Sequence, residues 1–135
     1  MSGEAGSLFA NDAFYQAFRT QDLAAMDRVW ARQSPVACIH PGWSALTARD
    51  DIMESWQAIF ANPEAPDIAC RGAKAYVSGQ QSFVICYELL GKGLLAATNI
   101  FVMEAGIWKM VHHQAGPCSP PPAGLPAEPE PPAIQ

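Results

Sequence analysis

Apolar residues in the first part of the chain recur with the 3.6-residue period of an α-helix. In residues 8–20, Phe14 and Phe18 lie one turn apart, and an apolar stripe with i, i+4, i+7 and i+8 spacing starts at Ile52. The pattern predicts three helices, of which the first covers residues 8–20. Asp22 caps the second helix and Ser34-Pro35 ends it. The third begins at a capping box formed by Thr47-Ala48-Arg49-Asp50 and runs to about Phe60.

After Asp67 the pattern changes to the extended texture of β-strands. Short turns that contain glycine separate the strands, so each link is a hairpin and neighbouring strands run antiparallel. Helices followed by a four-stranded meander are typical of an α+β fold, in which one face of an antiparallel sheet packs against the helices. The predicted strands are residues 68–77, 82–90, 94–104 and 107–113, with a short strand at 36–39 between the second and third helices.

Two-residue alternation also assigns each strand residue to a face of the sheet. In the last strand, Trp108, Met110, His112 and Gln114 are expected on one face. Both faces are largely apolar, but three helices can cover only one of them. Because a large exposed apolar surface is a liability, the pattern predicts a homodimer through the uncovered face of the sheet.

Composition sets the domain boundaries. Residues 117–135 hold eight prolines and almost no large apolar side chains, so an extended or disordered tail is expected there. Its proline clusters fit an SH3- or WW-like groove, although an inert tail is the simpler interpretation. We expect a flexible N-terminus at residues 1–7, one domain at residues 8–116 and the Pro-rich tail at residues 117–135.

The chain has 135 residues, of which half are apolar, and a formal net charge of −5. A weakly acidic protein is a poor match for a phosphate backbone or an anionic bilayer, which argues against nucleic-acid and membrane partners. No apolar run approaches the roughly 18–20 residues of a membrane span. The first residues lack the basic and apolar regions of a signal peptide, so a cytoplasmic location is expected.

The four cysteines have no CxxC spacing, and free structural thiols are expected in preference to a disulfide or a metal site. His112 and His113 are adjacent on a strand and point to opposite faces, so they are not expected to bind one metal ion together. No Gly-rich phosphate loop, serine elbow or HExxH motif is present in the sequence. We expect no metal and no cofactor.

The order of these elements and several short motifs resemble the nuclear-transport-factor-two-like superfamily, and most closely its SnoaL-like polyketide cyclase branch. The resemblance spans about residues 8–116. The motifs that carry it are Asp22-Leu23-Ala24-Ala25-Met26 leading to Trp30, His40-Pro41-Gly42, Arg49-Asp50-Asp51-Ile52 leading to Trp56, Cys86-Tyr87-Glu88, Thr98-Asn99-Ile100-Phe101 and residues 106–113.

This resemblance implies a cystatin-like roll, in which a curved sheet forms a cone with a pocket inside and a dimer forms through its convex face. Compared with the ketosteroid isomerases of the superfamily, His40 stands at the position of the aspartate base, Asn99 at that of a second acid, and Tyr15 at that of the tyrosine of the first helix. The chain is also similar to the association domain of calcium/calmodulin-dependent kinases. In that domain the positions of Glu88 and Asn99 face the pocket, and Gln114 replaces a closing histidine.

Three titratable residues are candidates for catalysis. His40, with an ordinary pKa near 6.5, is a candidate general base at the mouth of the pocket. Glu88, on an apolar strand, is a candidate proton carrier with His112 as its partner, because burial would raise its pKa. The alternatives are a hydrogen-bonded structural histidine at position 40 and a surface glutamate at position 88.

The remaining candidates would bind a ligand. Asn99 offers both a donor and an acceptor to a ligand carbonyl, or else satisfies nearby backbone groups. The tryptophans could form an aromatic box for a flat ligand, although core packing is the simpler explanation. The full set of candidate ligand-binding residues is Tyr15, Trp30, Trp43, Trp56, Asn99, Phe101, Trp108 and Gln114.

Two hypotheses about function follow. The first is a small cytoplasmic dimer that binds an apolar or aromatic small molecule in the cone and acts as a cofactor-free cyclase or isomerase by proton transfer. The second is a non-catalytic assembly or ligand-sensing module of the kinase association-domain type. An enzyme needs an inward titratable group within reach of open volume, which distinguishes the two.

Overall fold

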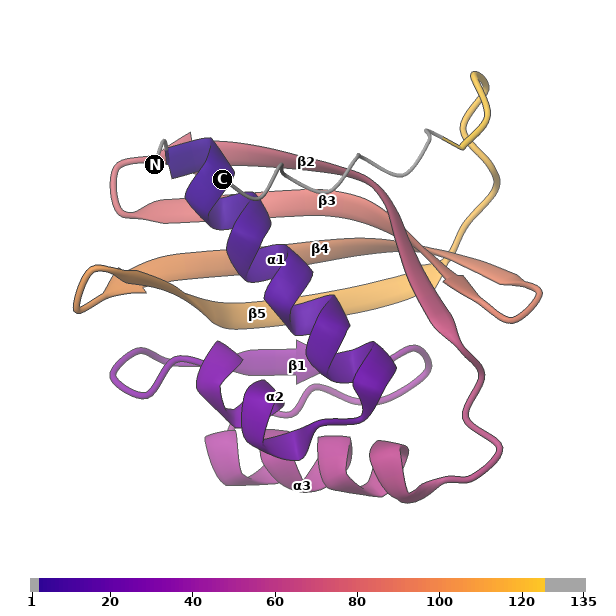
Figure 1. Cartoon of the computed structure of the whole chain (residues 1–135), viewed down its shortest axis with the longest axis horizontal. Helices are drawn as coiled ribbons and strands as arrows, with labels where there is room; N and C mark the ends of the chain where they lie inside the picture. The colour runs from indigo at the N-terminus through magenta and orange to yellow at the C-terminus, as the bar shows by residue number, and fades with distance from the viewer. Residues whose placement is uncertain (1–2, 126–135) are drawn as a thin grey trace, which may run out of the picture.

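The computed structural model describes residues 3–125, which form three helices and a five-stranded sheet. Helix α1 crosses one face of the sheet, and α2 and α3 lie beside the β1 edge (Figure 1). No helix in this part of the chain is long and apolar enough to cross a membrane. The elements are α1 (Gly3–Thr20), α2 (Leu23–Val29), β1 (Ala37–Ile39), α3 (Arg49–Ala61), β2 (Ile68–Ser78), β3 (Gln81–Leu90), β4 (Gly93–Glu104) and β5 (Ile107–Pro117).

The predicted α+β class and the antiparallel meander are confirmed. The strand order is β1-β5-β4-β3-β2, and the pairs β2–β3, β3–β4 and β4–β5 are antiparallel. The sheet is nevertheless mixed rather than purely antiparallel, because β1 pairs with β5 in parallel. The helix and three strands between β1 and β5 supply the long connection that parallel pairing needs.

Several predicted boundaries need correction. Helix α1 starts at Gly3, so the expectation of a flexible segment at residues 1–7 is wrong from Gly3 onward. Ser7 belongs to the core, where its hydroxyl is hydrogen-bonded to that of Ser82 at 2.7 Å. Asp22 caps α2 as predicted, whereas α3 has Ala48 at its N-cap and no side-chain cap. Strand β5 runs on to Pro117, and residues 126–135 of the predicted tail lie outside the described residues.

A β-bulge interrupts the pairing of β4 with β5. Ile100 pairs with His112, and the next residue of β4, Phe101, pairs with Met110. Val111 is therefore the extra residue on β5, and the side-chain alternation of this strand reverses at that point.

The bulge changes which histidine faces the helices. Before it, Trp108 and Met110 are buried as predicted, but after it the buried residues are His113 and Ala115. His112 is only half-buried and Gln114 is exposed. The prediction that these two residues share the inner face with Trp108 is wrong, since one extra residue shifts every later side chain to the other face.

The space between α1, α3 and the sheet is filled by side chains. Phe14, Trp56, Phe101, Trp30 and Met110 are at most 1% exposed, and the ring centroids of Phe14 and Trp56 lie 5.5 Å apart. The cone implied by the family resemblance is therefore closed over its interior in this conformation.

Candidate functional site

A cluster of polar side chains lies inside this apolar core. Asn11 and Tyr15 lie one turn apart on the sheet-facing side of α1, whereas Glu88, Asn99 and His113 come from β3, β4 and β5. All five residues are at most 2% exposed. Because buried polar groups are costly unless they are paired, their hydrogen bonds decide whether the cluster is stable.

Asn99 is the centre of the cluster. Its Nδ2 donates to Asn11 Oδ1 at 2.8 Å and to the Tyr15 hydroxyl at 3.1 Å. Its Oδ1 lies 2.6 Å from His113 Nδ1. Tyr15 in turn donates to Glu88 Oε2 at 2.6 Å. The amide thus links His113 to α1, whereas Glu88 is bonded to α1 directly through Tyr15.

These bonds set the tautomer of His113. Since the Nδ2 of Asn99 is the donor towards α1, its Oδ1 is an acceptor, so His113 Nδ1 must carry the ring proton. The unprotonated Nε2 then faces Glu88, with 4.0 Å between Nε2 and Oε2. At that distance the two groups are in contact without forming a hydrogen bond.

Glu88 is the group in the cluster that titrates near neutral pH. Burial raises its pKa from 4.5 to about 7, and the hydrogen bond from Tyr15 opposes this rise without cancelling it. Burial and the neighbouring Glu88 raise the pKa of Tyr15 well above its usual range, so Tyr15 keeps its proton. Near neutral pH, Glu88 therefore exists in both protonation states beside a permanent donor.

Both buried histidines are neutral. Burial lowers the pKa of His113 to about 3, with His40 and His112 adding to this effect, and burial lowers the pKa of His40 to about 4. As the pH falls, Glu88 takes up its proton at a much higher pH than His113 does. At acidic pH the contact between them therefore pairs a neutral imidazole with a neutral carboxyl group and is not a salt bridge.

His40 does not join the cluster. Its Nε2 lies 2.8 Å from the hydroxyl of Ser55, which donates its own proton to the carbonyl of Ile52 at 2.6 Å. The Nε2 must therefore be the donor, which fits the structural alternative for this histidine. The centroids of the His40 and His113 rings are 6.5 Å apart.

The predicted aromatic residues divide among three environments. Trp30, Trp56 and Phe101 fill the core, and the buried Nε1 atoms of Trp30 and Trp56 have no hydrogen-bond partner in the described part of the chain. Trp43 is 47% exposed on the loop after β1. Trp108 lies at the far end of the sheet, beside the β4–β5 hairpin.

A cavity of about 390 Å³ opens next to Trp43. It is lined by Phe18, Trp43 and Leu90, by the end of α3 and by the loop that follows α3. The Trp43 ring packs against His40 and the Phe18 ring against Trp56, with centroids 4.7 and 5.0 Å apart. We call this cavity the mouth cavity. The Trp56 and His40 rings lie behind its lining and separate it from His113 of the polar cluster.

Sequence reasoning missed Asn11 and His113. Asn11 could have been found from its spacing, since it lies four residues before Tyr15 and one turn before Phe14 on the same helix face. His113 could not, because no glycine or proline marks the bulge at Val111 that turns its side chain inward.

Comparison with known proteins agrees with this architecture. A crystal structure of a Streptomyces avermitilis protein of the NTF2-like family, provisionally assigned as a dehydratase, is 28% identical, with a TM-score of 0.76 over 84% of this chain and 95% of that one. A Thiobacillus denitrificans protein, provisionally assigned as a calcium/calmodulin-dependent protein kinase type II association domain, is 31% identical, with a TM-score of 0.73 over 82% and 93% of the two chains.

Among curated proteins, the F-box protein SKIP8 of Arabidopsis thaliana is 27% identical over 107 residues, which are 78% of this chain. The match covers 46% of SKIP8, so the chain spans about half the length of that relative. Residues 8–120 match the SnoaL-like domain family. The chain therefore belongs to the SnoaL-like domain family and has the NTF2-like fold.

Proposed function

We propose that this protein binds a small apolar or aromatic molecule and transfers a proton on it without a cofactor, with Glu88 as the catalytic acid or base. The observation that carries this proposal is a carboxyl group with a pKa near 7, buried in an apolar interior and hydrogen-bonded to a tyrosine. Strongly perturbed carboxyl groups of this kind are typical of general acid–base sites.

The neighbours of Glu88 support carbon-acid chemistry. A carboxylate at this position would take a proton from the carbon next to a carbonyl group, and the electron pair would move to the carbonyl oxygen. The Tyr15 hydroxyl and the Asn99 amide are donors in the same cluster, of the kind that stabilises such an oxygen. His113 positions Asn99 through the bond between its Nδ1 and Asn99 Oδ1.

The mouth cavity is the proposed entry site. Its volume of about 390 Å³ lies in the range of small-molecule sites, and aromatic and aliphatic side chains dominate its lining. Asn62 is the polar side chain of that lining. A flat, apolar substrate with a carbonyl group fits this composition, and it reaches Glu88 when the rings of Phe18 and Trp56 move apart.

Hydrogen–deuterium exchange of cyclic ketones tests the proposal. We expect the wild-type protein to accelerate the exchange of the acidic protons of tetralone or indanone in D₂O, and Glu88→Gln to lose about 100-fold or more of that acceleration. Proton NMR of the ketone measures the rate. His112→Asn, on the opposite face of β5, is the matched control and should keep the full rate. Equal rates for wild type and Glu88→Gln would contradict the catalytic role.

A second candidate function, a non-catalytic assembly module, is favoured by the outer face of the sheet. Tyr76, Phe83 and Ile85 point away from the helices and are each about 40% exposed, and the rings of Tyr76 and Phe83 are stacked at 4.8 Å. Lys74 Nζ lies 5.6 Å from the centroid of the Tyr76 ring. This exposed apolar face supports a homodimer through the sheet, and the dimer is compatible with either function.

Oligomeric state tests this part of the proposal. We expect wild-type protein to sediment as a dimer and Phe83→Lys to shift it to a monomer, since the new charge would be buried against the partner without a counter-ion. Analytical ultracentrifugation measures the change. Phe9→Lys, on the exposed side of α1, is the control. A monomeric wild type, or a dimer that Phe9→Lys disrupts and Phe83→Lys does not, would contradict dimerisation through the sheet.

A further inference from the structure

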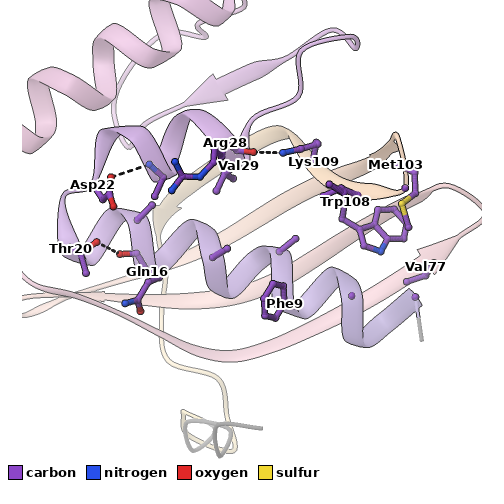
Figure 2. Close-up of a pocket in the computed structure, with 18 of the residues that line it drawn as sticks. Phe9, Gln16, Thr20, Asp22, Arg28, Val29, Val77, Met103, Trp108 and Lys109 are labelled. Carbon is purple, nitrogen blue, oxygen red and sulfur yellow. Dashed lines mark hydrogen bonds between the residues drawn. The ribbon is translucent and has the colours of Figure 1, made fainter. Parts of the chain in front are cut away.

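A second cavity lies at the other end of the molecule from the mouth cavity and has a volume of about 890 Å³. It is an open groove, which we call the α1 groove (Figure 2). One wall is α1, the opposite wall is α2, and the tips of the β2–β3 and β4–β5 hairpins close the end. None of the residues of the polar cluster around Asn99 lines it.

The α1 wall has the spacing of a helix–helix seam. Its small residues alternate at intervals of three and four, which is the a/d repeat that faces a partner helix in a coiled coil. Short side chains at these positions allow a second helix to approach closely. The seam residues that line the groove are Gly3, Gly6, Ala10, Ala13, Ala17 and Thr20.

Helix α2 is too short to cover this seam. It has seven residues and follows α1 through a tight turn at which Asp22 N donates to Ala17 O. Seven residues span about 10 Å, whereas the 18 residues of α1 span about 27 Å. The part of the seam from Gly3 to Ala13 is therefore left without a helical neighbour.

Trp108 supplies a hydrogen-bond donor to the groove. Its side chain is 8% exposed, and its ring faces α1 across the groove with the indole nitrogen directed towards the helix (Figure 2). Among residues 3–125, the buried side-chain nitrogens without a partner are those of Trp30 and Trp56, so the Nε1 of Trp108 is accessible from the groove that this residue lines. An accessible donor on the wall of the groove can bond a group that enters it.

The charges of the groove define the partner further. Arg28 and Lys109 line it on the α2 side, and Lys109 Nζ donates to the backbone carbonyl of Arg28 at 2.5 Å, which holds the Lys109 side chain at this edge (Figure 2). Asp22 is the acidic residue of the lining. Phe9 and Ile107 are 65% and 57% exposed and border the same groove. The groove is thus apolar with an excess of positive charge at one edge.

We propose that the α1 groove binds an amphipathic helix of a partner protein, with the apolar face of that helix on the Gly/Ala seam and acidic residues opposite Arg28 and Lys109. Recognition by helix-in-groove packing explains the length of the groove, the a/d spacing of its wall and its open side. An acceptor on the bound helix would take the Trp108 indole proton. This inference is independent of the proposed proton transfer, because it uses none of the same residues.

A synthetic helix tests the proposal. The probe is a labelled peptide of about three heptads with Leu at a and d and Glu at e and g, compared with a second peptide that has Lys in place of Glu. We expect the acidic peptide to bind the full-length protein, the Lys peptide to bind at least tenfold more weakly, and added salt to reduce the difference. Fluorescence anisotropy gives Kd, and the indole signals in ¹⁵N NMR spectra, assigned with Trp108→Phe, report on the groove.

Variants of the groove locate the binding. Ala13→Leu should weaken binding of the acidic peptide at least tenfold, because the larger side chain occupies the seam. Trp108→Phe should weaken it about fivefold through the lost hydrogen bond. Ala24→Leu, the same change on the exposed side of α2, should leave Kd unchanged. Circular dichroism verifies that each variant is folded.

Three outcomes would overturn the proposal. One is that the acidic peptide does not bind, or binds no better than the Lys peptide. Another is that Ala13→Leu and Ala24→Leu have equal effects. The third is that sodium laurate, but not the peptide, shifts the Trp108 indole signal, which would assign the groove to a fatty-acid-like ligand.

Discussion

Replacing Asn99 with Leu is expected to lower the free energy of unfolding by about 4 kcal/mol, because the change leaves several buried groups without partners at a cost of roughly 1–3 kcal/mol each. Asn11 Oδ1 loses its donor, and His113 Nδ1 loses its acceptor. The Tyr15 hydroxyl loses the amide that donates to it. Urea denaturation followed by tryptophan fluorescence measures the effect.

Thr98→Val is the matched control for this substitution. Thr98 is the preceding residue of β4, and its side chain points to the other face of the sheet. We expect Thr98→Val to change stability by less than about 0.5 kcal/mol, as is usual away from a buried network. A loss below about 1 kcal/mol for Asn99→Leu would contradict the network around this amide.

Acidification from pH 7 to pH 5 is expected to destabilise the wild-type protein by about 2 kcal/mol and the Glu88→Gln variant by about 4 kcal/mol. The histidines are the cause of the loss. His40 and His113 have folded-state pKa values of about 4 and 3, so between pH 7 and 5 they gain protons only when the chain unfolds. Unfolding then takes up protons, and stability falls with pH.

Glu88 acts in the opposite direction. Its pKa is about 7 in the folded protein and 4.5 as a model value, so in the same pH range the folded state binds the extra proton. Its contribution is fully present below pH 4.5 and is lost as the pH rises through 7. Glu88→Gln removes this offset, which makes the acid destabilisation steeper.

Urea titrations at pH 5, 6 and 7 measure these slopes. His40→Gln provides a second arm, because it removes one of the two histidines and should leave stability almost constant over this range. Asp27 and Glu104 do not interfere, since hydrogen bonds from Arg49 and from residues 32–34, respectively, hold their pKa values below the usual range. Parallel pH dependences for wild type and Glu88→Gln would contradict the raised pKa of Glu88.

The pH dependence and the proposed chemistry have a common origin. The core holds an ionisable carboxyl group that stays partly charged near pH 7, although an apolar residue of similar size would avoid this cost. Proteins break their own packing rules most often at functional sites. The energetic cost of Glu88 is thus consistent with a functional role for this residue.

Most of the fold could be predicted from local patterns. The stripe that starts at Ile52 predicted α3, and Asp22 predicted the cap of α2, because both signals act within one or two helical turns. Alternation along β3 placed Glu88 and Phe83 on opposite faces, and in the structure Glu88 is buried and Phe83 is exposed. Each of these inferences depends on neighbours in the sequence, whose relative positions the backbone period defines.

The site could be predicted only in part. The family resemblance implied that Glu88 and Asn99 face the pocket, and both are buried in one hydrogen-bonded cluster with Tyr15. His112 was expected beside them, and His113 lies there because the bulge in β5 depends on how this strand pairs with β4. A bulge forms between two strands, so one strand alone does not reveal it.

The tryptophans show the same limit. Core packing was the simpler expectation for all four tryptophans, with one aromatic box as the alternative. Trp30 and Trp56 lie in the core, whereas Trp43 lies at the mouth cavity and Trp108 in the α1 groove. Hydrophobicity indicates that a side chain will be buried but does not specify which neighbours will bury it. Those neighbours depend on how α1 crosses the sheet.

Local patterning was thus sufficient for the existence and order of the helices, for the meander and for the alternation of faces along β3, since periodicity is a short-range effect. The parallel pairing of β1 with β5, the inward turn of His113, the closed interior and the groove beside α1 arise only when distant segments pack together. These features depend on strand register and on the length of α2 relative to α1, which are properties of pairs of elements rather than of any one segment.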